Sequence, residues 1–254
     1  MQLIVDDRHL GQSESAWKLS KGLLGVSPIE FGDIQRIVLV APHPDDEVFG
    51  AGGIIQYALS NDVSLKLISV TDGEGCHPNS VVATTLDLAA VRSRESREAL
   101  RRLGWNDPEI MQLHLPDGDV KSNQEILRSV LLSMLRPGDL CVAPWEFDGH
   151  PDHDACGAAA LWASSVVGVK TLSYLVWAWH WADPSGLEIP WEQCWRHDLS
   201  RRERARKRWA TGAFESQIYP IGCDAGDAAV LPPPLLRRFW RPYEIYVESS
   251  RAPT

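Results

Sequence analysis

The chain has little of what marks proteins that bind nucleic acid. Lysine and arginine number 25 against 34 aspartate and glutamate residues, which gives a formal net charge of −9. Because proteins that grip nucleic-acid phosphates usually carry a basic surface, this excess of acid argues against a nucleic-acid partner. One basic run, residues 201–208, is predicted to be a solvated helix face.

Cysteine and long apolar runs are also scarce. The five cysteines are odd in number and include no C-x-x-C pair, which suits reduced thiols and argues against a disulfide framework. No stretch approaches the roughly 20 apolar residues that a membrane span requires. The first residues lack the pattern of a signal peptide, so the expected location is the cytoplasm.

What is present is the composition of an ordinary globular protein, 44% apolar and 23% charged over 254 residues. Short β-branched runs alternate with longer amphipathic segments. Strands are predicted over residues 36–41, 64–70, 110–113, 140–143, 171–179 and 243–247. Helices are predicted over residues 46–59, 86–103, 125–135, 155–167 and 199–211. This alternation predicts an α/β, Rossmann-like fold with a mostly parallel sheet flanked by helices.

The domain prediction has two parts. Residues 1–34 are expected to be an N-terminal appendage, and residues 35–254 a single α/β domain without an internal linker. Residues 181–195 are rich in tryptophan and are expected to form a loop.

Two clusters of histidine and carboxylate side chains follow two of the predicted strands. The first reads His43-Pro44-Asp45-Asp46-Glu47, and the second His150-Pro151-Asp152-His153-Asp154. In a sheet of this kind, ligands bind beyond the carboxyl ends of the strands, where both clusters would lie. We therefore expect the clusters to converge there on one divalent metal ion.

The expected ligands are His43, Asp46 and His153, which leave coordination positions open for water and substrate. Such an ion lowers the pKa of a bound water and polarises a carbonyl group. Asp45 is then the candidate general base, and His150 would stabilise the oxyanion or protonate the leaving amine. Taken singly, the first cluster suits the acidic start of a helix and the second a polar loop, but the pair favours a metal site.

Three glycines follow the first cluster, at positions 50, 52 and 53. Their missing side chains would let the first helix pack closely on the sheet, or would clear room for a ligand. The sequence leaves both interpretations open.

These motifs resemble those of the PIG-L/LmbE-like zinc-dependent N-deacetylases. The resemblance rests on the two clusters and extends over about residues 36–217, with weaker matches around Arg92 and Asp117. It implies zinc, with iron(II) as an alternative, held by His43, Asp46 and His153. It further implies Asp45 as general base, and His150 as a second catalytic group oriented by Asp152.

The resemblance also suggests residues that bind substrate. Arg92 and Asp117 match positions that hold sugar hydroxyls; the alternatives are an intrahelical ion pair for Arg92 and a turn role for Asp117. Trp145 precedes the second cluster and is expected to line the pocket. Asp148 stands where some members of the family have a tyrosine, and an acidic side chain there is expected to favour a cationic substrate group.

The predicted function is hydrolysis of an N-acetyl or other N-acyl group from an amino sugar or its conjugate. The expected partner is a small sugar-like amide, and a homo-oligomer is compatible with the sequence. The alternatives are a metal-dependent amidase acting on a non-sugar amide or a thiol conjugate, and a catalytically inactive metal-binding module.

Overall fold

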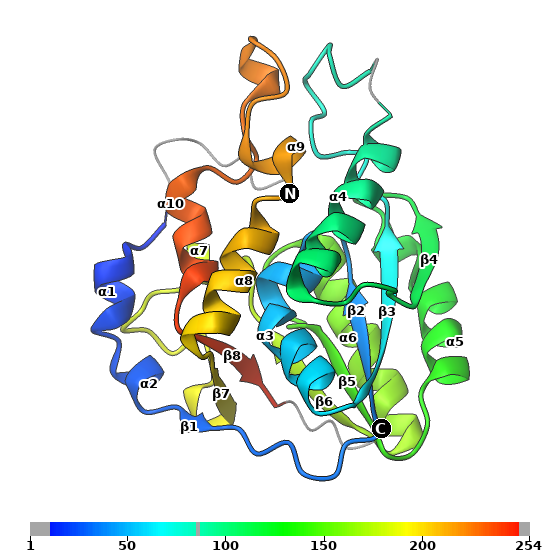
Figure 1. Ribbon diagram of the computed structural model, residues 1–254, viewed down its shortest axis with the longest axis vertical. Helices are drawn as coiled ribbons and strands as arrows, with labels where there is room; N and C mark the ends of the chain where they lie inside the picture. The colour runs from blue at the N-terminus through cyan, green and yellow to red at the C-terminus, as the bar shows by residue number, and fades with distance from the viewer. Residues whose placement is uncertain (1–10, 85–86, 249–254) are drawn as a thin grey trace.

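The computed structural model describes residues 11–84 and 87–248, which fold around one twisted sheet (Figure 1). Within these residues the sheet has eight strands in the order β1-β7-β8-β6-β5-β2-β3-β4. The strands are β1 (Ser27–Pro28), β2 (Arg36–Ala41), β3 (Ser64–Thr71), β4 (Ile110–Leu115), β5 (Asp139–Pro144), β6 (Lys170–Tyr174), β7 (Cys194–Asp198) and β8 (Tyr243–Val247). The predicted α/β architecture is confirmed.

The topology places a crevice between β2 and β5. From β2 the chain adds β3 and then β4 towards one edge of the sheet. It then returns and adds β5 and β6 on the other side of β2. Each of these strands is parallel to its neighbours among them. Only β8 runs antiparallel to its neighbours β6 and β7 within the described sheet. A reversal of strand order between parallel strands opens a binding crevice at their carboxyl ends.

Helices cover both faces of the sheet. The α-helices are α1 (Glu14–Lys18), α2 (Lys21–Leu24), α3 (Asp46–Ser60), α4 (Leu88–Leu103), α5 (Gln124–Met134), α6 (Pro151–Val167), α7 (Ala178–Trp181), α8 (Arg201–Thr211), α9 (Glu215–Ile218) and α10 (Pro233–Leu236). Short 3₁₀ helices span Val120–Asn123, Trp191–Gln193, Ala225–Asp227 and Arg237–Trp240. Among the described residues, no helix has the length and apolar character of a membrane span.

Strand β2 shows how the two layers are built. Its side chains alternate between the faces, so Ile37 and Leu39 join the core under α3 and α4, while Val38 and Val40 join the core under α5 and α6. All four are fully buried, as expected for a central parallel strand. The predicted solvated face of α8 is also present, because Arg201, Arg202, Arg204 and Arg208 are exposed.

The described part of the predicted N-terminal appendage packs against the α/β body. Strand β1 pairs with β7 in the same sheet, and Trp17 of α1 is completely buried in the main core. The Trp17 indole donates a hydrogen bond to the carbonyl of Trp179. Residues 1–10 lie outside the described residues, so the domain boundary at residue 34 stays a prediction.

Beyond residue 170, one predicted strand is too long and one strand was not predicted. The strand expected over 171–179 ends at Tyr174, because three successive amides from Val176 to Ala178 donate to the Asp148 carboxylate and the chain then turns into α7. The expected loop is present over residues 182–190, but Cys194 and Trp195 belong to β7, a half-buried strand between β1 and β8. Trp177 lies beyond the end of β6, and Trp179 and Trp181 lie in α7.

The glycines of α3 serve close packing. A Cβ atom at Gly50 would lie 2.2 Å from the ring of Tyr174, and one at Gly53 would lie 2.6 Å from the Glu244 carboxylate. The amide of Gly53 donates to Glu244, which is also paired with the buried ammonium of Lys207 at 2.5 Å. Protein atoms thus fill the space beside these glycines, which supports the packing interpretation.

We expect Gly50→Ala to lower stability by about 1–3 kcal/mol, the usual cost of forcing extra volume into a packed core. Tyr174 cannot easily yield, because it is fully buried and its hydroxyl donates to the carbonyl of Val40. Thermal unfolding checks this. Gly25→Ala is the matched control, since the nearest atom to its Cβ would be 3.4 Å away. An unchanged melting temperature for Gly50→Ala would contradict the packing interpretation.

Candidate metal and catalytic site

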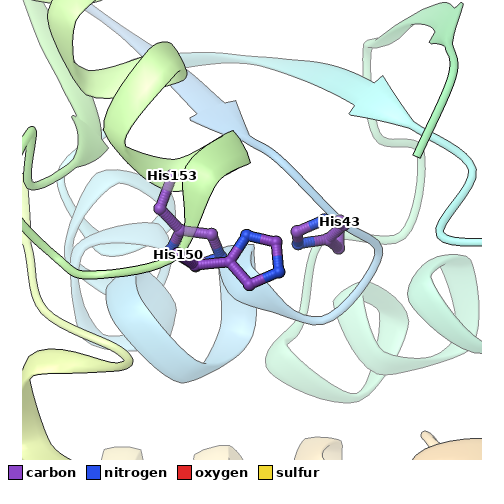
Figure 2. A group of neighbouring side chains, drawn as sticks. All are labelled: His43, His150 and His153. Atoms are coloured by element: carbon purple, nitrogen blue, oxygen red, sulfur yellow. The ribbon is translucent and has the colours of Figure 1, made fainter. Parts of the chain in front are cut away.

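The two sequence clusters meet at the predicted crevice. His43 follows β2, and His150 and His153 come from the start of α6, so their imidazole rings lie together (Figure 2). One oxygen of Asp46, Oδ2, lies 3.2 Å from Nδ1 of His43 and 3.1 Å from Nε2 of His153. The expected ligands His43, Asp46 and His153 therefore surround one small region.

The donors in this region fit a divalent cation. His153 is completely buried, and neither of its ring nitrogens has a partner with hydrogen-bond geometry among the described residues, although Asp46 and Asp148 lie within ion-pair distance. Ligand atoms of His43, His150 and His153 all lie within 4.8 Å of one another. A mixed imidazole and carboxylate set with such spacing suits zinc or iron(II).

A second group of carboxylates lies on the other edge of the His43 ring. Its Nε2 is 3.1 Å from Asp117 and 3.2 Å from Asp152. Burial opposes protonation of His43, but hydrogen bonds with Asp117, Asp152 and Asp46 outweigh burial and raise its pKa well above the usual value. The same negative field that holds a proton here would favour a bound cation.

Asp152 does not sit where orientation of His150 would require. Its fully buried carboxylate contacts His43 and accepts hydrogen bonds from the amides of Gly118 and Val120, at 2.8 and 3.1 Å. What reaches His150 is the backbone amide of Asp152, which donates to Nδ1 at 3.2 Å. The carboxylate thus orients His43 and the Gly118 turn, because His150 is the N-cap of α6 and turns its ring towards the backbone.

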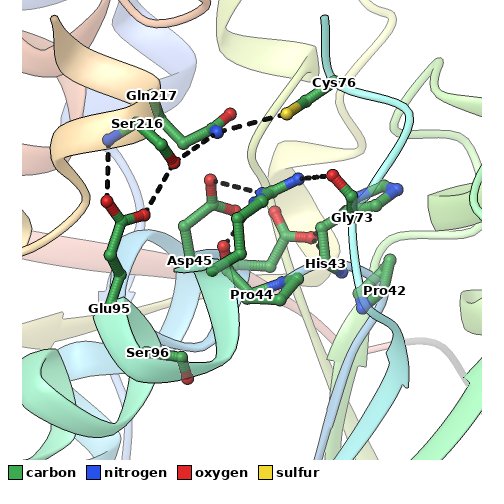
Figure 3. Close-up of polar contacts among 12 residues, drawn as sticks. Pro42, His43, Pro44, Asp45, Gly73, Cys76, Glu95, Ser96, Ser216 and Gln217 are labelled. Carbon is green, nitrogen blue, oxygen red and sulfur yellow. Dashed lines mark hydrogen bonds and ion pairs between the residues drawn. The ribbon is translucent and has the colours of Figure 1, made fainter. Parts of the chain in front are cut away.

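Asp45 adopts an unusual backbone conformation at the start of α3. Its φ is 140°, and its amide donates to the carboxylate of Glu47 at 2.9 Å. Its own carboxylate accepts a hydrogen bond from Arg92 at 3.1 Å (Figure 3). Burial raises the pKa of Asp45 to about 8, against the opposing effect of Arg92. A non-glycine residue at positive φ persists only where its surroundings hold it.

Glu47 helps to hold this conformation, although no role was predicted for it. It is fully buried, and it accepts hydrogen bonds from the Asp45 amide and from the hydroxyl of Ser96, at 2.9 and 2.6 Å. Burial raises its pKa to about 7. The only available signal was a third acidic residue in the cluster, which the acidic start of a helix also explains.

Arg92 joins three parts of the site. Its guanidinium donates to the carbonyls of Gly73 and Pro44 and to the Asp45 carboxylate. The alternative intrahelical pair is absent, because Glu95 accepts from Ser216 instead (Figure 3), and Glu98 pairs with Arg101 and Arg102. Arg92 also lines the cavity described below, so its predicted contact with substrate is compatible with its position.

His150 is held in one tautomer. Since Nδ1 accepts the Asp152 amide, the proton of the neutral ring lies on Nε2. The ring stacks on Trp177 at a centroid distance of 5.7 Å. Burial, with help from His153 and His43, lowers the pKa of His150 to about 3. At neutral pH this side chain is therefore an uncharged hydrogen-bond donor.

Asp148 has a different place from the one expected. Its carboxylate is completely buried, contacts Nδ1 of His153 at 2.8 Å and accepts the amides of Val176, Trp177 and Ala178. It cannot meet a cationic substrate group. It fixes the ring of His153 instead, as carboxylates behind metal-binding histidines commonly do.

A cavity of about 390 Å³ opens over these groups. Its wall includes His43, Asp45, Asp46, Phe49, Gly75, Cys76, Arg92, Asp117, Gly118, His150, Pro151, Val176, Trp177, Gln217, Val230 and Leu231. Trp145 is not among them, because it is buried in the main core with an exposed fraction of 4%. The tryptophan that lines the cavity is Trp177.

The family model described as "GlcNAc-PI de-N-acetylase" (PIG-L) matches residues 38–164, half of the chain and both clusters. The chain belongs to the PIG-L family. Among its curated relatives, diacetylchitobiose deacetylase of Thermococcus kodakarensis is 27% identical over 147 residues, 56% of this chain and 54% of the relative. A probable N-acetyl-alpha-D-glucosaminyl L-malate deacetylase 2 of Bacillus subtilis is 28% identical over 134 residues, 50% of this chain and 59% of the relative.

The matches span little more than half the length of these curated relatives. Solved structures extend the likeness in fold. The A40926 pseudoaglycone deacetylase Dbv21 aligns with a TM-score of 0.61 at 20% identity, over 86% of this chain and all of that one. The N,N'-diacetylchitobiose deacetylase of Pyrococcus horikoshii aligns with a TM-score of 0.55 at 22% identity, over 72% and 70% of the two chains.

Proposed function

We propose that this PIG-L family chain is a metal-dependent hydrolase that removes an acetyl group from the nitrogen of an amino sugar or amino-sugar conjugate. The observation that carries the proposal is the convergence of residues 43–46 and 150–153 on one cavity, with Asp45 and His150 in its wall. A module that only bound a metal would need neither of these two side chains.

We assign His43, Asp46 and His153 to a zinc ion, with iron(II) as the alternative. When bound, the ion would act as a Lewis acid on the amide carbonyl and make water more acidic. Asp148 would hold His153, and Asp152 with Asp117 would hold His43, since these carboxylates contact the outer nitrogens of the two rings.

The remaining groups would transfer protons, stabilise the oxyanion and position the substrate. Asp45 takes a proton from the attacking water and later delivers it to the leaving amine, which a carboxylate with a raised pKa suits. His150 donates a hydrogen bond from Nε2 to the developing oxyanion. Arg92 positions Asp45 and, with Asp117, faces the cavity where sugar hydroxyls would lie.

The named activities of the relatives support an amino-sugar substrate. By their names, the two relatives described above are a deacetylase of diacetylchitobiose and a probable deacetylase of N-acetyl-alpha-D-glucosaminyl L-malate. The decisive experiment is a screen of N-acetylglucosamine conjugates for release of free amine by the purified chain, with N-acetylated amino acids as non-sugar amides. Release from the non-sugar amides alone would contradict the proposal and favour the amidase alternative.

We expect one divalent ion per chain, because the two clusters supply one set of ligands. Elemental analysis of the purified protein measures it. The double variant His43→Ala, His153→Ala should lose the ion, while Cys223→Ala, at an exposed thiol, should keep it. Full metal content in the double variant would remove both histidines from the ligand set.

Asp148→Asn should lower metal affinity by about 10–100-fold, the usual cost of disturbing a group behind a metal-binding histidine. The change replaces one carboxylate oxygen by an amide donor, which faces either His153 or the amides of residues 176–178. Competition with a chelator of known affinity measures the loss. Asp183→Asn is the control, since Asp183 is exposed and its carboxylate also accepts a nearby backbone amide, that of Ser185. Equal metal affinities for Asp148→Asn and the wild type would mean that Asp148 only accepts the backbone amides of residues 176–178 and does not support His153.

A further inference from the structure

The side chains that line the cavity fall into two chemical sets. One set is assigned above to the metal, the proton transfers and the sugar. The other set, which we call the apolar wall, consists of Phe49, Val176, Trp177, Val230 and Leu231. Trp177 stacks on His150, but the assigned reaction uses none of the other four side chains, and a single acetyl methyl group could not cover them. The apolar wall therefore needs a ligand group of its own.

The outer part of this wall comes from a segment beyond residues 38–164, the range that the family model matches. Residues 219–232, drawn in orange, project past the carboxyl ends of the strands beside residues 73–84 (Figure 1). We call these two stretches the mouth segments. Val230 and Leu231 are consequently features of this chain that the shared deacetylase motifs do not explain.

The mouth segments are fastened to each other and to the body. The hydroxyl of Ser80 donates to Asp227, and a Cβ at Gly226 would lie 2.2 Å from the carbonyl of Asn79. The amide of Leu231 donates to the carbonyl of Gln217 in α9 at 2.8 Å. The wall is thus held in place before a ligand binds, so binding would include no free-energy cost of ordering it.

Depth in the cavity decides which part of the substrate meets the wall. The reacting amide must lie beside His43 and Asp46, whose exposed fractions are 8% and 2%. Val230 is partly exposed and belongs to a mouth segment, whereas Trp177 stacks on His150 and so lies beside the reacting groups. Val230 would therefore contact the end of the substrate that is distant from the amide, which is the group attached to the sugar.

We infer that the apolar wall is a subsite for an apolar aglycone, an aryl or alkyl group attached to the amino sugar. This inference rests on the proposed function and names the substrate class for it. Each methylene placed in an apolar pocket is worth about 10–200-fold in discrimination. An aryl or hexyl glycoside should therefore exceed the methyl glycoside in kcat/KM by at least about 10-fold.

The test compares the methyl, hexyl and phenyl β-glycosides of N-acetylglucosamine, with a second series in which the sugar is a methyl glycoside and the acyl group is lengthened. The wild-type chain should prefer the apolar glycosides, and Val230→Asn should abolish that preference while still cleaving the methyl glycoside. Val166→Asn is the matched control, because Val166 is 57% exposed on α6 and is absent from the cavity wall.

Equal kcat/KM for the three glycosides would overturn the subsite and leave the deacetylase proposal standing. A preference for long acyl groups instead would assign the wall to the acyl side and also overturn it. If no glycoside were cleaved, the proposed function would fail, and calorimetric binding of phenyl and methyl glucosaminide would decide the subsite. Tighter binding of the phenyl compound, lost in Val230→Asn, supports it, and equal binding overturns it.

Discussion

Asp45→Asn should lower kcat by about 10²–10⁴, the usual contribution of a general base, while the metal content stays unchanged. Asparagine keeps the size of the side chain and an oxygen that can accept from Arg92, but it cannot take a proton. Asparagine has the same size and branching as aspartate, so it adds no steric demand to the backbone at φ 140°. Single-turnover deacetylation together with elemental analysis measures both quantities.

The matched control is Asp62→Asn. Asp62 also has a positive φ, of 55°, but it is exposed on the turn after α3. It should leave both the rate and the metal content unchanged. Near-normal turnover by Asp45→Asn would place the base elsewhere. Loss of the ion in that variant would instead make Asp45 a ligand and require a new ligand set.

The positions of these groups followed from the sequence wherever the determining contacts are local. Val38 to Ala41 form a buried strand, and a strand that ends beside His43 and Asp46 can only present them at its carboxyl end. The same argument placed His150 and His153. The geometry of parallel strands then brought the two clusters together, without any knowledge of individual contacts.

What could not be predicted depends on contacts between distant segments. The apolar pattern of residues 171–179 continues past Tyr174, yet the strand stops because the carboxylate of Asp148 collects the next amides. The sequence favours Trp145 as the pocket residue, because it precedes the second cluster, and gives no such signal for Trp177. Only the packed structure buries the former and exposes the latter to the cavity.

The contacts of the carboxylates in the site could not be predicted from the sequence either. Asp148 and Asp152 lie close in sequence to His150, but they contact His153 and His43 respectively. Spacing along the chain gives no information on which imidazole each carboxylate reaches, because Asp148 lies in the turn before α6 and Asp152 in the first turn of the helix. The helix starts at Pro151, four residues before the predicted start, and this sets the directions of Asp152 and His153.

His150→Ala should lower kcat by about 10²–10³, the cost of removing one donor to an oxyanion. The imidazole is also the N-cap of α6, whose loss by itself costs about 0.5–2 kcal/mol of stability. His150→Asn separates the two effects, since asparagine is a good N-cap but is too short to place a donor where Nε2 lies. It should restore stability and leave kcat low.

The pH profile distinguishes the neutral donor from a charged acid. With its pKa lowered to about 3, His150 stays uncharged above that pH. Its titration should therefore cause no change in kcat/KM near pH 6.5. The kcat/KM profiles of wild type and His150→Asn should thus run parallel between about pH 5 and 8. If His150 were instead a protonated acid of ordinary pKa, wild-type activity would fall as the pH rose through 6.5, and the variant would lack that fall.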